Sequence, residues 1–409
     1  MNIYGYIILA AIVLELALKL IADALNLSAL KPELPGEFKG DIDEATYAKS
    51  QRYTRERTRF SIGVALFDTA LFVCFWLLGG FPFVDGLVAG VFESVILRGL
   101  LFFAIFAIVK GIIDLPFEIY STFVIEERYG FNRTSWKTFV GDHIKNLLVG
   151  ALLGLPLLAG IMWILQIAGG WAWLWGWGLS MVFVVVIQFI APIWIMPLFN
   201  KFTPLEDGPL RQSIVALADR AGFPVTKIFV IDGSRRSSKA NAFLAGFGKN
   251  RRIAFYDNLM EDTTDEELLA VLAHEIGHQK RGHVLKGMVL SALNMGAIFL
   301  LLQVFITHAG LYRTFFMDTT PIYAGLLFFT YLISPVQTLL AVLVNMFSRR
   351  NEYEADAFAK KLTGNPAPLV AALKKLSRRN LANLTPHPFH VFVNYSHPPV
   401  LKRIEVLRG

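Results

Sequence analysis

Residues 274–278 read His-Glu-Ile-Gly-His, and these residue types at this spacing suit metal-dependent hydrolysis. On a helix, His274 and His278 lie four positions apart and project from the same face. Two imidazoles so placed can bind one Zn²⁺, and Glu275 between them can serve as general base for a water molecule that the metal activates. The pattern fixes only three residues and arises by accident in about one chain in a hundred of this length, so the surrounding sequence must decide.

The residues before this pentapeptide predict a helix. Thr264 and Glu267 form a capping box, and the acidic residues of the first turn interact favourably with the helix dipole. The apolar side of the predicted helix consists of Leu268, Leu269, Leu272 and Ile276. The alternative interpretation is a packed helix that carries two histidines without a metal.

A catalytic zinc site needs a third protein ligand and keeps one position for water. His283 lies nine residues past His274, about half a turn round a continuing helix, so we expect it to point away and to lie at the top of a membrane span. Glu352 and Asp356 are one helical turn apart on one face of a later helix, with Glu354 on another face. We predict that Glu352 is the third ligand and that Asp356 accepts the free ring N–H of one ligand histidine.

The composition predicts a polytopic membrane protein. The chain has 409 residues, of which 55% are hydrophobic and only 17% are charged, and its mean hydropathy is +0.50. Soluble domains carry about 25% charged residues. Seven stretches approach the roughly 20 residues needed to cross a bilayer, near 3–24, 61–80, 94–113, 145–168, 173–197, 284–306 and 322–346.

Lysine and arginine in the connecting loops predict the orientation of these spans. The first and third loops, the segment 199–283 and the C-terminal tail are basic, whereas 81–93 and 169–172 contain no Lys or Arg and 307–321 contains only Arg313. This alternation places the N-terminus outside and both polar segments in the cytosol. The net charge of +7 then reflects topology and attraction to the lipid bilayer, and we find no nucleic-acid-binding motif. The single Cys74 excludes an internal disulfide.

The chain divides into four stretches. Residues 1–198 hold five spans, 199–283 form a polar cytosolic segment that ends in the His-Glu helix, 284–347 form a two-span hairpin, and 348–409 form a mainly helical tail with the third ligand. Within the polar segment we predict a helix near 208–221 and strands at 227–231, 242–247 and 252–256. The His-Glu helix enters span six directly and the Glu352 helix leaves span seven directly, so the hairpin brings both to one membrane surface.

Several spans contain ionisable or amide side chains, which are costly in lipid and usually face a protein interior or water. They are Glu15, Lys19, Asp23, Asp68, Lys110, Gln188, Asn294 and Gln337. Residues near the end of a span, such as Asp23, could instead reach the interface. Lys110 and Asp68 indicate a hydrated space between the helices.

The combined motifs resemble those of the integral-membrane type I CAAX prenyl proteases. The resemblance includes the His-Glu-Ile-Gly-His helix after span five, the Glu-Tyr-Glu-Ala-Asp run from Glu352, the Asn-Tyr-Ser-His-Pro-Pro run around His397, and Ser-Ser-Lys-Ala-Asn-Ala-Phe around Asn241. It implies an all-α polytopic protein of seven membrane helices around a large hollow chamber, with a small α+β cytosolic zinc-metalloprotease domain.

By the same resemblance, His274, His278 and Glu352 bind one Zn²⁺ per chain and Glu275 is the base. Asn241 and His397 contact the substrate or the oxyanion, and Arg403 supports the site. The implied substrates are prenylated CAAX proteins, which lose their C-terminal tripeptide. The final residues Val-Leu-Arg-Gly differ from the dilysine signal of eukaryotic members, which favours a prokaryotic plasma-membrane protein with another natural substrate.

The residues alone leave alternatives open. The stretch from Ala242 could pair with an extended peptide as an added strand with Asn241 at its end, and His397 could donate to an oxyanion. Asn241 could equally be a turn residue and His397 a loop histidine. A membrane-protein quality-control protease and a non-catalytic channel or translocon-associated protein with structural zinc are the alternative functions. The intact Glu275 argues against the last, since a structural site has no use for that carboxylate.

Overall fold

The computed structural model describes residues 2–225, 227–245 and 252–409. Within them, seven helical segments are long and apolar enough to cross a membrane, as the sequence predicts. These segments are α1 (Ile3–Ser28), α2 (Glu44–Leu77), α4 (Val95–Tyr120) with the π-helical turn Ser121–Glu126, α5 (Trp136–Ile167), α6 (Ala172–Ile190) with α7 (Met196–Phe199), α11 (His283–Phe305) and α13 (Ile322–Thr363).

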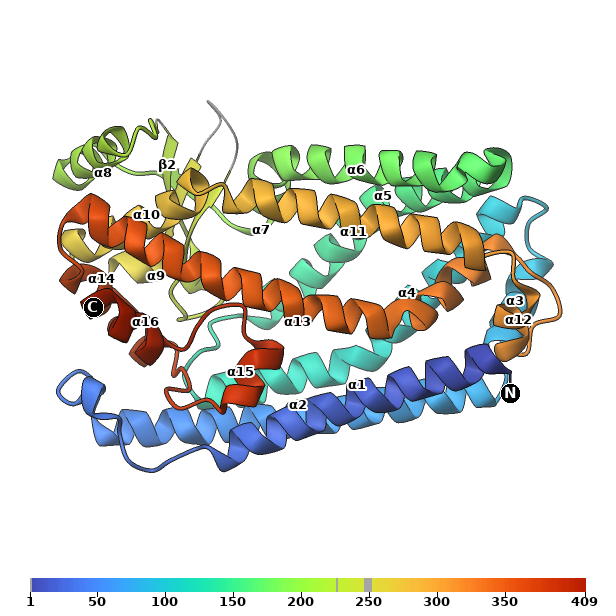
Figure 1. Ribbon diagram of the computed structural model, residues 1–409, viewed down its shortest axis with the longest axis horizontal. Helices are drawn as coiled ribbons and strands as arrows, with labels where there is room; N and C mark the ends of the chain where they lie inside the picture. The colour runs from blue at the N-terminus through green and yellow to red at the C-terminus, as the bar shows by residue number, and fades with distance from the viewer. Residues whose placement is uncertain (1, 226, 246–251) are drawn as a thin grey trace.

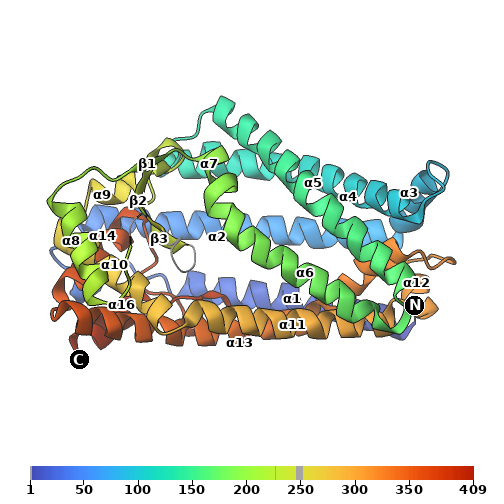
Figure 2. The ribbon, with the colours of Figure 1, turned by 90° about the horizontal axis from the view of Figure 1, so that it is seen from above.

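The membrane helices run along the long axis of the molecule, and the remaining elements gather at its two ends (Figure 1). The short helices α3 (Gly80–Ala89) and α12 (Ala309–Thr314) lie at the end that holds the N-terminus. The opposite end holds the small sheet and α8 (Pro209–Arg220), α9 (Asp257–Met260), α10 (Asp265–Lys280), α14 (Ala367–Arg379) and α16 (Val400–Arg408). Figure 2 shows the same separation from a perpendicular direction.

Four short strands form one sheet in the order β1-β2-β4-β3. They are β1 (Phe202–Pro204), β2 (Lys227–Ile231), β3 (Ala242–Ala245) and β4 (Arg252–Tyr256). The strands predicted at 227–231 and 252–256 are confirmed, and the third is confirmed over 242–245, since 246–247 lie outside the described residues. The two central strands are parallel, and β3 pairs antiparallel with β4 and occupies an edge of the sheet.

The core around the sheet draws on distant parts of the chain. Leu268, Leu272 and Ile276 of α10 are buried there, as the apolar side of the predicted helix requires. Phe38 and Tyr47 from the first connecting loop and the start of α2 belong to the same cluster. The metal-binding motif is therefore supported by residues that precede it by more than two hundred positions.

Polar side chains within the membrane helices pair with one another. Lys110 contacts Asp114 and lies 3.4 Å from Asp68, and Thr338 donates to Glu15 at 2.9 Å. The Lys110 side chain is nevertheless 50% exposed near the middle of α4. A charged group at that depth usually faces the protein interior or water. The hydrated space between the membrane helices stays a prediction.

Candidate metal centre

Helix α10 begins as the sequence predicts. The Thr264 hydroxyl accepts from the Glu267 N–H at 3.3 Å, and the Glu267 carboxylate accepts from the Thr264 N–H at 2.8 Å. This reciprocal capping box satisfies two backbone donors that the helix cannot satisfy itself. Because the start of α10 is fixed in this way, the rotational position of His274 and His278 on the helix is fixed as well.

Gly277 lets α10 approach α13 closely. A Cβ atom at this position would lie 3.1 Å from both the Cα and the carbonyl oxygen of Ala355 and 3.3 Å from Cβ of Phe358. These distances are tighter than most real Cβ contacts, so any larger residue would force the Ala355 backbone to shift by a few tenths of an ångström. The pentapeptide therefore supplies the two histidines and also the glycine that allows α10 to pack closely on α13, so that Glu352 lies near both histidines.

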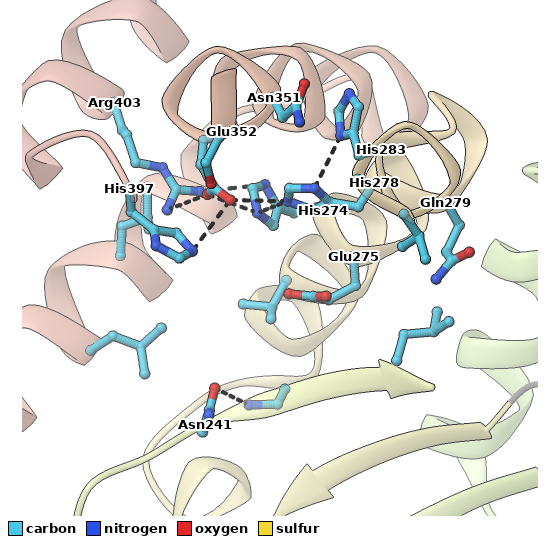
Figure 3. Close-up of a pocket in the computed structure, with 18 of the residues that line it drawn as sticks. Asn241, His274, Glu275, His278, Gln279, His283, Asn351, Glu352, His397 and Arg403 are labelled. Atoms are coloured by element: carbon cyan, nitrogen blue, oxygen red, sulfur yellow. Dashed lines mark hydrogen bonds and ion pairs between the residues drawn. The ribbon is translucent and has the colours of Figure 1, made fainter. Parts of the chain in front are cut away.

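His274, His278 and Glu352 converge at this helix crossing (Figure 3). The two Nε2 atoms are 3.2 Å apart, and the Glu352 carboxylate lies 3.2 Å from His278 Nε2 and 3.4 Å from His274 Nε2. One ligand atom from each residue can be chosen so that all lie within 4.8 Å of one another. The sequence predicts this group of three, and the structure places them together.

A further pair of charged side chains orients these groups. Asp356 lies 2.8 Å from His274 Nδ1 and forms two hydrogen bonds with Arg403, at 2.7 and 2.9 Å. Arg403 also lies 3.3 Å from Glu352. All four side chains are buried. Burial disfavours the His274 imidazolium, but the hydrogen bonds to Asp356 and Glu352 outweigh it and raise the pKa of His274 to about 9. The site thus favours positive charge beside these carboxylates.

The donor set fits a divalent cation. Glu352 Oε2 is buried and makes no hydrogen bond, although Arg403 and His274 Nε2 lie 3.3 and 3.4 Å from it. A cation between the histidines and Glu352 would satisfy this atom. Two imidazole nitrogens and one carboxylate are ligands that catalytic zinc sites use, with a position left for water. These residues therefore fit a metal ion.

Glu275 projects from α10 toward β3, on the side of the histidines that faces Asn241 (Figure 3). Burial raises the pKa of its carboxyl, and the neighbouring histidines partly offset this effect. A carboxylate with a raised pKa beside a metal site is a suitable proton acceptor. The role of general base that the motif predicts for Glu275 stays a prediction.

His397 and Asn241 flank the site from two other elements. His397 precedes α16 and is 63% exposed, and its Nε2 lies 3.3 Å from the Glu352 carboxylate. Asn241 precedes β3, and its side-chain oxygen accepts from the Ala242 N–H at 2.9 Å. Both residues line a cavity of about 920 Å³ together with His274, Glu275 and Leu244.

The prediction that His283 points away is wrong. Its Nδ1 lies 3.1 Å from His278 Nδ1, its Nε2 lies 3.2 Å from Glu354, and it is buried. The reason is a break between α10 and α11, because Gly282 adopts φ +68° and ends the helix. The His-Glu helix therefore does not run straight into span six, and His283 supports His278 from outside the metal group.

Sequence reasoning also missed the residues that hold the chain before Asn241. The Asn258 amide donates to the carbonyl oxygens of Ser237 and Lys239 at 3.0 and 2.8 Å, and the Asn380 side chain accepts from the Ala240 N–H at 3.2 Å. No periodicity or motif marks these two asparagines. Their contacts fix the backbone from which β3 and Asn241 extend toward the metal site.

Fold and site together define an integral-membrane metallopeptidase. A family model described as the CAAX prenyl protease N-terminal region with five membrane helices matches residues 23–201, and the model of peptidase family M48 matches residues 204–409. The chain therefore belongs to peptidase family M48 and, within it, to the CAAX prenyl protease 1 group, as the resemblance predicts.

Individual relatives cover nearly the whole chain. A protein of Arabidopsis thaliana named CAAX prenyl protease 1 homolog is 38% identical over 401 residues, which cover 95% of this chain and 93% of the relative. A human protein of the same name is 33% identical, with 92% and 88% covered. The crystal structure of Ste24p from S. mikatae has a TM-score of 0.95 and 33% identity, and covers 100% of both chains.

Proposed function

We propose that this chain is a zinc metalloendopeptidase that removes the C-terminal tripeptide from prenylated CAAX proteins. The observation that carries this proposal is the convergence of His274, His278 and Glu352 beside Glu275, in a cavity that also exposes the edge strand β3. These ligands would hold one Zn²⁺ per chain. Bound there, zinc would supply Lewis acidity and a water molecule of lowered pKa.

Each of the other side chains has its own role in the proposed reaction. Glu275 takes a proton from the attacking water and returns it to the leaving amine. His397 donates a hydrogen bond to the oxygen of the tetrahedral intermediate, a contribution that is typically worth about 2.7–4 kcal/mol. Asp356 holds His274 in one tautomer, and Arg403 compensates the charge of both buried carboxylates.

The edge of β3 with which no other described strand pairs is suited to hold the substrate backbone. Its partner β4 pairs with the opposite edge of the strand, and Ala242 and Leu244 line the cavity. An extended peptide can add to such a free edge through backbone hydrogen bonds, with Asn241 fixing its end. Because these contacts need only backbone atoms, the sequence preference near the cut should be broad and mainly apolar.

The membrane location supports a lipid-bearing substrate. The relatives are named as CAAX prenyl proteases, and the residues of the candidate metal centre lie on α10, which precedes the membrane helix α11, and on the part of α13 that follows its membrane span. Burying each CH₂ group of a lipid contributes about 0.8 kcal/mol, so a prenyl chain adds considerable affinity to a peptide. We therefore propose that the lipid is recognised as well as the peptide.

Substitution of the base tests the chemistry. Glu275→Gln should retain zinc and the folded state but lose peptide cleavage by about 10²–10⁴-fold, because only the proton acceptor is removed. Turnover of a farnesylated CAAX peptide and zinc content are measured on the same purified samples. Near-normal turnover in a zinc-loaded variant would contradict the proposed reaction.

The lipid is tested with matched peptides and wild-type protein. A farnesylated CAAX peptide should be cleaved with at least tenfold higher kcat/KM than the same sequence without the lipid, since the prenyl chain contributes binding energy. Equal kcat/KM for the two peptides would mean that the lipid is not recognised. The function would then be that of a protease for misfolded membrane proteins.

We propose further that both polar segments face the cytosol and that the N-terminus lies on the opposite side. The loop charges support this orientation. The relatives named above are eukaryotic, and a prokaryotic plasma membrane as the location of this chain remains a prediction. The divisions 1–198, 199–283, 284–347 and 348–409 are proposed as its functional segments.

A further inference from the structure

A second cavity lies where α5 begins beside the sheet. Its volume is about 760 Å³, and it shares no lining residue with the cavity of the metal centre. One wall is the start of α5, and the other is the turn that contains Ser234 and Arg235. The cavity is therefore a feature of the junction between the membrane helices and the polar segment.

An ion pair holds the two walls together. Arg236 donates to both oxygens of Asp142 at 2.7 and 3.0 Å, and to the Asn200 side chain at 3.0 Å. Lys145, one turn along α5, donates to the carbonyl oxygen of Leu198 at 2.8 Å. These contacts connect α5, the end of α7 and the turn after β2. The shape of the cavity is thus determined by the fold and does not depend on a loop alone.

The lining of this cavity is strongly positive. Arg133, Lys137, Lys145 and Arg235 all line it and are all exposed. Within the described part of the chain, no carboxylate pairs with the side chains of Arg133, Lys137 or Arg235. The one acid in the lining, Asp142, forms an ion pair with Arg236 and also lies 3.7 Å from Lys145 Nζ, which leaves Arg133, Lys137 and Arg235 as the cations without a carboxylate partner. Asp257 accepts two hydrogen bonds from Ser234 on the rim.

The surroundings place this charge at the membrane surface. Trp136, which lies in the first turn of α5 between the lining residues Ser135 and Lys137 in sequence, is 56% exposed and stacks on Phe123, as expected for an aromatic side chain at the level of lipid headgroups. Beyond it, Ile144, Leu148 and Leu152 follow at four-residue steps on α5 and are 53%, 63% and 74% exposed. An apolar track for acyl chains therefore begins directly beside the positive cavity.

We propose that this cavity binds the phosphate-bearing headgroup of an anionic glycerophospholipid. Clustered cations without carboxylate partners at the end of a membrane helix are the chemistry that recognises such headgroups, and the adjoining track of α5 accepts the acyl chains. A soluble phosphate compound shares the headgroup chemistry but would not use the apolar track. The site is independent of the proposed peptidase reaction, and its occupation would brace the junction between α5 and the sheet segment.

Lipid binding to the full chain tests this proposal. The delipidated protein in neutral detergent is titrated with dioctanoyl phosphatidylglycerol, and bound lipid is counted by native mass spectrometry. We expect one lipid per chain, bound at least tenfold more tightly than dioctanoyl phosphatidylcholine. The triple variant R133Q/K137Q/R235Q should bind on the order of a hundredfold more weakly, because three headgroup cations are lost.

A matched variant distinguishes binding of the lipid at this cavity from a general attraction between the anionic lipid and the positively charged protein. R52Q/R55Q/R59Q removes as many exposed positive charges from α2, whose start lies at the same end of the molecule, but none of these residues lines the cavity. It should change the affinity by less than about threefold. Equal weakening in both triple variants would overturn the proposal.

Two further measurements are needed. The first distinguishes a lipid site from a site for a soluble phosphate compound, and the second distinguishes the loss of charge recognition from the loss of the fold. Glycerol 3-phosphate binding as tightly as the lipid would overturn the lipid assignment in favour of a soluble phosphate compound. The charge-conserving variant R133K/K137R/R235K keeps all three cations and should retain at least a tenth of the affinity, with an unfolding temperature near that of the wild type. Complete loss of binding in this folded variant would also contradict recognition by charge.

Discussion

The carboxylate of Glu352 lies within 3.4 Å of four side chains that are basic or can become so. They are His274, His278, His397 and Arg403. A buried carboxylate is stable only when such partners compensate its charge. Glu352 is therefore the residue on which the metal group, the proposed oxyanion donor and the supporting arginine all depend.

Zinc content distinguishes the proposed ligands from their neighbours. Purified wild-type protein should contain one Zn²⁺ per chain, and His278→Ala or Glu352→Ala should lose most of it, because each removes one of three ligands. His283→Ala should keep the ion but release it to a chelator about tenfold more readily, since His283 only supports His278. Elemental analysis checks the content. Full zinc in Glu352→Ala would rule out Glu352 as the third ligand.

Some residues of the site can be predicted from the sequence, and others cannot. His274, Glu275 and His278 follow from one motif, and Glu352 follows from the expectation that a hairpin returns to the same membrane surface. Arg403 was found only through the family resemblance, because a single arginine at a distance of 129 residues from His274 has no recognisable spacing. His283 was misplaced because a glycine in a helical run does not reveal whether it continues the helix or adopts positive φ.

At the scale of elements, the apolar periodicity and strand patterns predicted most of the fold. The seven spans and two complete strands are in place because long apolar runs and short runs of β-branched and aromatic residues are strong signals. The strand β1 was missed, since three residues ending in proline carry no pattern. The two π-helical turns after α4 and α6 were missed as well, because they depend on tertiary packing.

The crossing of α10 and α13 depends on Gly277. Gly277→Ala should destabilise the protein by about 1–3 kcal/mol, because its methyl group would press on the Ala355 backbone. It should also weaken zinc binding by separating the histidines from Glu352. Thermal unfolding in detergent checks the stability. Gly154→Ala in α5 is the control, since a Cβ there meets nothing within 4 Å, and it should be neutral or stabilising by up to about 1 kcal/mol.

At the scale of the whole molecule, the two ends of the helix bundle should lie on opposite sides of the membrane. In a Cys74→Ala background, single cysteines in place of Glu44 and Glu206 should react with a membrane-impermeant reagent only from the cytosolic side. A cysteine in place of Asp318 should react only from the other side. All three positions are exposed. Reaction of the Glu206 position from the outer side would contradict the orientation inferred from loop charge.

The helix α13 is long enough to connect its membrane span rigidly to residues outside the membrane. Its 42 residues extend about 63 Å, roughly twice the hydrocarbon thickness of a bilayer, and Glu352 lies on the part beyond the membrane span. The histidines are separated from their own span by the break at Gly282, so we expect a change in the tilt of α13 to strain the close contact between Ala355 and Gly277 through which Glu352 faces them.

We therefore predict that the rate of peptide cleavage depends on the thickness of the membrane. In vesicles of phosphatidylcholine with acyl chains of increasing length, kcat/KM should pass through a maximum and fall several-fold on either side, while the chain stays folded. A rate that is independent of thickness would show that α13 bends instead, and Pro335 within the helix is where such a bend would form. Through this one helix, the activity of a peptidase centre outside the lipid is expected to depend on the thickness of the membrane.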